Sequence, residues 1–138
     1  MSGKFVLTYG RGDGGQGEAL VGTVSGTSIT LGTPHVFDIY NINAGGVALA
    51  TDMHTTGRFV LFSYTGGVGK VRTGQVTGTS ITYGADVTLT NNVQGMTPRG
   101  VSMDPNTPNR FVLSYATSTG DWGAECIVGI MSGTGITL

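Results

Sequence analysis

The chain repeats itself at an interval of 52 to 55 residues, and this period limits its fold more than any single residue does. The tripeptide Phe-Val-Leu occurs at Phe5–Leu7, Phe59–Leu61 and Phe111–Leu113, each time with a Tyr two or three residues later. A second landmark, Gly-Thr-Ser/Gly-Ile-Thr, recurs at Gly26–Thr30, Gly78–Thr82 and Gly133–Thr137. A period of this length indicates a supersecondary unit that buries its apolar face against copies of itself.

The composition is that of strands and turns. The 138 residues include 25 Gly but only 11% charged residues, and the net charge is -1. This length suits one compact domain, and we expect residues 1–138 to form a single all-β repeat domain. The few basic residues form no stripe, so we expect no nucleic-acid partner. No apolar run is long enough to span a bilayer and Met1–Lys4 lead straight into a strand, so we expect no membrane partner and no signal peptide.

One repeat contains four predicted strands. In the first copy they are Phe5–Tyr9, Ala19–Val24, Ile29–Phe37 and, opening the next copy, Val47–Thr51. The third strand should bend at Gly32–Pro34, because Pro cannot donate a ladder hydrogen bond. No segment has the 3.6-residue apolar period of a helix.

The turn between the second and third strands is predicted to be a two-residue hairpin. Gly stands at the first central position of Ser25–Ser28, Thr77–Ser80 and Ser132–Gly135, as a type II′ turn requires. Length varies in the loop after each Phe-Val-Leu strand, over 10–17, 65–69 and 116–124. We therefore expect variable loops on one face of the domain and a repetitive scaffold on the other.

Four antiparallel strands in about 50 residues match the size of a kelch-type β-propeller blade. The chain holds about 2.7 such blades, in repeats at about 4–46, 47–100 and 101–138, whereas closed propellers typically use four to eight. We therefore expect a homo-oligomer or a piece of a longer array. A β-trefoil or β-prism is the alternative fold.

Two glycine-rich segments resemble nucleotide-binding loops but lack their context. Gly10–Gly15 satisfies Gly-x-Gly-x-x-Gly but is followed by a strand where a dinucleotide site needs a helix. Gly66–Lys70 lacks the Ser or Thr that a phosphate loop places after its Lys. Arg11 and Asp13 lie in an Arg-Gly-Asp adhesion tripeptide, which makes them candidate ligand-binding residues; the alternative is a chance match in a Gly-rich turn.

The sequence offers no catalytic constellation, and we expect no enzyme activity, cofactor or metal. Asp52 and Asp104 are equivalent by repeat, and their predicted role is to accept backbone N–H bonds in a turn. Cys126 aligns with Ala19 and Val71, so we expect it to be a small buried core residue. One cysteine cannot form an internal disulfide.

Asp121 and Trp122 lie in the longest variable loop. An exposed aromatic ring beside a carboxylate is typical of sugar sites, where the ring stacks and the oxygens accept hydrogen bonds. The alternative is a Trp packed against its own sheet or between subunits. The other two variable loops carry no aromatic residue, which favours this alternative.

The repeat unit resembles the blade-type repeats of bacteriophage and other virion structural proteins, often tail-associated. The matching segments are Lys4–Tyr9, Gly22–Gly32, Arg58–Tyr64, Gly74–Gly84, Arg110–Tyr115 and Gly129–Leu138. The resemblance implies a structural or receptor-facing role and supplies no active-site residues.

Two functions follow as hypotheses. The first is a non-enzymatic virion structural protein, located in the virion or extracellularly, that assembles through its blade edges. The second is a carbohydrate-binding lectin built from several short chains, with a glycan or cell-surface receptor as its partner.

Overall fold

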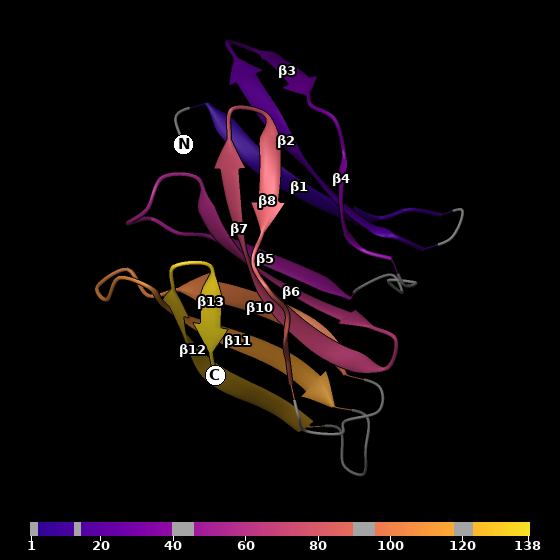
Figure 1. Ribbon diagram of the computed structural model, residues 1–138, viewed down its shortest axis with the longest axis vertical. Coiled ribbons are helices and arrows are strands. Elements are labelled where there is room, and N and C mark those ends of the chain that lie inside the picture. Colours follow the sequence, from indigo (N-terminus) through magenta and orange to yellow (C-terminus); the bar gives the residue numbers. More distant parts are fainter. Residues whose placement is uncertain (1–2, 13–14, 40–45, 90–95, 118–122) are drawn as a thin grey trace.

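The computed structural model describes residues 3–12, 15–39, 46–89, 96–117 and 123–138. These residues form thirteen β-strands in three antiparallel sheets and no helix, which confirms the predicted all-β class. Figure 1 shows the sheets following one another along the long axis, with the N-terminal sheet at the top and the C-terminal sheet at the bottom.

In each sheet the first three or four strands are hydrogen-bonded in chain order. The first contains β1 (Lys4–Gly10), β2 (Gly17–Ser25), β3 (Ser28–Leu31) and β4 (His35–Asp38). The second contains β5 (Val47–Thr51), β6 (Arg58–Thr65), β7 (Val68–Thr77), β8 (Ser80–Tyr83) and β9 (Val87–Thr88). The third contains β10 (Thr97–Met103), β11 (Arg110–Thr117), β12 (Gly123–Ser132) and β13 (Gly135–Thr137). The third sheet thus takes in Thr97–Gly100, which the repeat pattern placed at the end of the second repeat.

The strand that the sequence predicts to bend at Gly32–Pro34 is interrupted there and forms two strands. β3 ends at Leu31 and β4 begins at His35, and both pair with β2. Pro34 lies in the break, where its missing N–H costs no ladder hydrogen bond. β8 and β9 both pair with β7 across an equivalent break.

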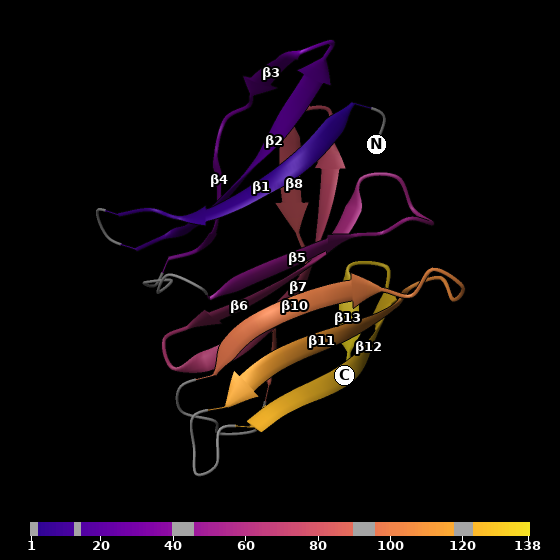
Figure 2. The same cartoon turned by 180° about the vertical axis from the view of Figure 1, so that it is seen from behind.

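The sheets stack as separate units, which the view from behind in Figure 2 also shows. The described residues contain three sheets of four or five strands and no closed barrel. Separate four-stranded units are what the blade interpretation requires, whereas a β-trefoil is built around a barrel. Closure into a propeller stays a prediction.

Each sheet has two faces, which we name from the Phe-Val-Leu segment. The Leu face carries the Phe and the Leu, and the Val face carries the Val between them, because side chains alternate along a strand. One core cluster joins Val6 and Val21 of the first Val face to Phe59 and Leu61 of the second Leu face. A second cluster joins the second Val face to the third Leu face in the same way. Both internal interfaces therefore pair a Val face with a Leu face.

A phenylalanine ring covers a glycine on the neighbouring strand in every sheet. The three pairs are Phe5 with Gly22, Phe59 with Gly74 and Phe111 with Gly129. A Cβ added to any of these glycines would lie within 2.2 Å of the ring tip. The ring thus occupies the space that a side chain on the neighbouring strand would need, which makes glycine necessary at this position.

The hairpin turns have the predicted geometry. Gly26, Gly78 and Gly133 have φ of 59°, 64° and 59°. The residue after each has no positive φ, because Asn109 is the one non-glycine residue with positive φ in the described chain. A positive φ at the first central position alone fits a type II′ turn and excludes type I′.

We predict that Gly74→Ala lowers the free energy of unfolding by about 1–3 kcal/mol, because the added methyl group collides with the Phe59 ring. Chemical denaturation measures the change. Gly12→Ala is the matched control, since Gly12 has ordinary φ and no atom near its would-be Cβ; its effect should stay within about 0.5 kcal/mol. The loss from Gly74→Ala should shrink in a Phe59→Leu background, and equal losses in both backgrounds would argue against the ring contact as its cause.

Candidate functional site

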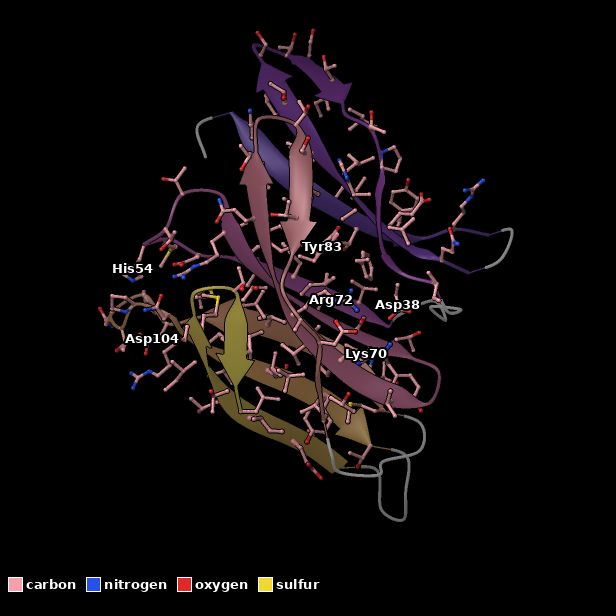
Figure 3. The ribbon with its side chains drawn as sticks, in the orientation of Figure 1. Asp38, His54, Lys70, Arg72, Tyr83 and Asp104 are labelled. Atoms are coloured by element: carbon pink, nitrogen blue, oxygen red, sulfur yellow. The ribbon has the colours of Figure 1, made fainter. Side chains whose placement is uncertain are left out.

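The most concentrated charged group in the described residues lies between the first and second sheets. Arg72 and Lys70 of β7 meet Asp38 at the end of β4 and Asp86 just before β9, as Figure 3 shows for Arg72, Lys70 and Asp38. The guanidinium of Arg72 lies 2.9 Å from Asp86 and 3.5 Å from Asp38. The Lys70 ammonium lies 3.3 Å from Asp38 and 3.9 Å from Asp86.

Two aromatic rings flank the buried Arg72 side chain. The guanidinium carbon lies 5.7 Å from the centre of the Phe37 ring and 6.0 Å from that of Tyr83, within the range of cation–π attraction. Arg72 also donates a hydrogen bond to the carbonyl oxygen of Phe37, while its Nε is buried and has no hydrogen-bond partner among the described residues. Burial raises the pKa of Tyr83 to about 12, so this hydroxyl stays protonated at neutral pH.

A cavity of about 300 Å³ opens beside this cluster and is lined by its four charged side chains with Val36 and Ile39. Two cations and two carboxylates neutralise each other there. A group that is already paired is a poor nucleophile or proton carrier, so the cluster fits a structural role that locks the first sheet onto the second.

Sequence reasoning missed this cluster. The sequence feature that could have indicated the cluster is Lys70-Val71-Arg72, which places a charged residue on each side of a buried residue within a predicted strand. A central strand with a charge at a core position needs a partner charge, and the repeat identifies the core position: Leu20 and Ile127 occupy it in the other two sheets.

Asp52 and Asp104 have the turn role that the sequence predicts. The Asp52 carboxylate accepts the His54 backbone N–H at 2.8 Å, and Asp104 accepts the backbone N–H of Asn106 at 2.8 Å. Each carboxylate also pairs with the Arg that opens the next strand, Arg58 or Arg110, at 2.5 Å. Arg58 additionally donates to the Asn109 side chain in the third sheet, so this turn links two sheets.

Of the four candidate ligand residues, the structure describes Arg11. Arg11 is exposed at the end of β1, where it lies 3.7 Å from the Glu18 carboxylate. Asp13, Asp121 and Trp122 lie outside the described residues, so both the adhesion tripeptide and the sugar-site hypothesis stay predictions. Residues 13–14 and 118–122 of the variable loops likewise lie outside the described residues.

The prediction that Cys126 is buried is wrong. Its thiol is exposed, although the equivalent Ala19 and Val71 are fully buried. The alignment is right, because the three residues occupy the same register. Cys126 lies on the Val face of the third sheet, however, and none of the other described sheets packs on that face.

The described residues contain no group of three or more His, Cys, Asp or Glu side chains placed to hold a metal ion. Nor do they include a helix with the length and apolar character needed to cross a membrane. The chain matches no family model, no curated protein and no solved structure.

We predict that Arg72→Leu lowers the free energy of unfolding by about 3 kcal/mol, because the buried Asp38 carboxylate loses one of its two cations. The double variant Arg72→Leu/Asp38→Asn should recover part of the loss. Arg99→Leu, which removes an exposed cation from β10, is the control and should change stability by less than about 0.5 kcal/mol. Additive effects in the double variant would show that the two groups do not interact.

A second prediction concerns pH. Burial acts to raise the pKa of Asp52, but the His54 N–H and the Arg58 guanidinium outweigh it and hold the pKa below its ordinary value of 3.8. A carboxyl whose pKa is lowered by folding stabilises the protein above its unfolded pKa, and this contribution is lost as pH falls through the folded pKa.

Thermal unfolding should therefore separate the wild type from Asp52→Asn at neutral pH, and the gap should close on acidification below about pH 4. Asp104→Asn is the matched variant in the equivalent but more exposed turn, and it should produce a smaller gap. A gap for Asp52→Asn that is constant from neutral to acid pH would contradict this account.

Proposed function

We propose that the chain is a non-enzymatic structural protein of a virion that assembles with further copies through the open surfaces of its sheets. The observation that carries this proposal is the exposure of large apolar side chains at both ends of the stack. Leu7, Ile29 and Leu31 are exposed on the first sheet, and Val112, Val128 and Ile130 are exposed on the third. Contiguous apolar surface on a soluble domain is typical of an interaction site.

An open strand edge adds to this support. Within the part of the chain that the structure describes, β1 pairs only with β2, whereas the equivalent β6 and β11 each have a partner on both sides. An uncovered edge offers a row of backbone N–H and C=O groups to another chain.

The proposal assigns no catalytic residue and no cofactor. The charged side chains of the inter-sheet cluster pair with one another, and the turn carboxylates pair with arginines and backbone N–H groups. The basic residues are few and mostly paired in this way, which favours a protein partner over nucleic acid or a membrane. The virion or extracellular location rests on the resemblance of the repeat unit to virion blade repeats.

Solution mass and glycan binding test this function together. We expect light scattering to give a multiple of the 14.1 kDa chain mass and a glycan array to give no binding. A well-folded 14.1 kDa monomer would contradict the assembly function. Glycan binding that Trp122→Ala abolishes would instead establish the lectin alternative.

A further inference from the structure

The two ends of the stack are different surfaces. Among the described residues, no second sheet packs on the Leu face of the first sheet, where Leu7 and Ile29 are exposed although Leu20 is buried, or on the Val face of the third sheet. The other face of each of these two sheets is used inside the chain. Every internal interface joins a Val face to a Leu face. The two ends of the stack are therefore a Leu face and a Val face, the two kinds of surface that pair inside the chain.

Equivalent positions show what these ends lack. Leu7 is 44% exposed, whereas its counterparts Leu61 and Leu113 are fully buried. Ile29 is 62% exposed, whereas Ile81 is 6% exposed under the first sheet. The residues are apolar at each copy, and what differs is the presence of a neighbouring Val face.

The opposite end shows the same loss. Val128 is 57% exposed, whereas its counterparts Val21 and Thr73 are buried. Cys126 is exposed in place of the buried Ala19 and Val71. Here the missing neighbour is a Leu face.

The free Leu face is nearly a copy of one that packs inside the chain. Phe5, Leu7 and Tyr9 repeat the sequence of Phe111, Leu113 and Tyr115, which pack on the second Val face. Even the polar contact is the same: Tyr9 donates to the Glu18 carboxylate at 2.7 Å, as Tyr115 does to Glu125.

The free Val face likewise resembles the first one, which packs on a Leu face inside the chain. Val112 and Ser114 of β11 correspond to Val6 and Thr8 of β1. Val128 and Cys126 of β12 correspond to Val21 and Ala19 of β2. The paired residues are similar in size and polarity at these four positions, whereas Ile130 stands where the first Val face has Thr23.

A basic residue adjoins this surface as well. The residue before each Phe-Val-Leu segment is Lys4, Arg58 or Arg110. Lys4 donates to the Gly78 carbonyl of the next sheet at 2.7 Å, and Arg58 donates to Asn109 of the next sheet. Arg110 has the equivalent position in the third sheet, from which it could donate a hydrogen bond to a turn in the first sheet of a second copy.

From this match we infer that the open Val face of the third sheet binds the open Leu face of the first sheet in a second copy of the chain. The contact continues the internal stacking: β3 of the second copy lies against β12, as β8 lies against β2 and β13 against β7. Such a head-to-tail interface leaves one open end on each side, and therefore generates a ring or a filament. The inference rests on the proposed assembly function and specifies its contact surfaces.

Two variants that block one end each provide the test. Leu7→Lys/Ile29→Lys places charges on the Leu face, and Val128→Lys/Ile130→Lys places them on the Val face. Either variant alone should raise the dissociation constant of the assembly about 100-fold, tenfold for each buried position that becomes charged. An equimolar mixture of the two should form a heterodimer of one copy each, because each variant retains the end that the other has lost.

Met53→Lys is the matched control, since Met53 is equally exposed but lies in a turn outside both faces, and it should assemble like the wild type. Circular dichroism establishes that each variant is folded. If a Lys variant is unfolded, the milder Leu7→Thr/Ile29→Thr and Val128→Thr/Ile130→Thr replace it.

The outcomes separate this inference from the function on which it rests. A wild-type monomer would overturn both. A wild-type assembly that neither variant disturbs would overturn only the head-to-tail contact and would point to the open edge of β1. An assembly that one variant abolishes and the other leaves intact would indicate a contact between identical faces, which also contradicts the inference.

Discussion

The packing of a phenylalanine ring onto a glycine in the next strand is the contact on which the rest of the structure depends. The ring of Phe59 lies across Gly74, and it can do so only because Gly74 has no Cβ. The ring then forms part of a smooth Leu face that another sheet can approach. Since the pair occurs in every repeat, each sheet presents a phenylalanine ring at the same place on its Leu face, and stacking becomes a property of the unit.

When similar units stack, their common faces do not determine which sheet packs on which. The charged cluster around Arg72 determines it for the interface between the first and second sheets. Leu20 and Ile127 at the equivalent positions would pack on any Val face, whereas Arg72 needs the carboxylate of Asp38 and the ring of Phe37 beside it. A buried charge without its partner costs several kcal/mol, so a sheet in the wrong place would be penalised. The cluster thus adds specificity to an interface whose stability comes from apolar burial.

The repeat made the strands, the interrupted edge strand and the hairpin turns predictable, because each depends on local chemistry such as Pro34 or Gly26. The turn role of Asp52 followed for the same reason. Burial was harder to predict: Cys126 aligns with buried residues, yet it is exposed, because burial depends on whether another sheet follows. The charged cluster was missed because Asp38 and Arg72 lie in different repeats, 34 residues apart. Aligning the repeats compares residues at equivalent positions, and these two residues are not at equivalent positions.

Burial also explains how the three repeats have diverged. The second sheet is covered on both faces, and its Val face carries the large Phe62 where the outer sheets have Thr8 and Ser114. A small hydroxyl residue is nevertheless compatible with an interface, since Thr8 lies on the Val face that packs against the second sheet. The Val face of the third sheet nevertheless exposes Val112, Val128 and Ile130, where a surface adapted to solvent would favour charged residues. These apolar residues are the feature of the third sheet that supports the proposed contact with a second copy.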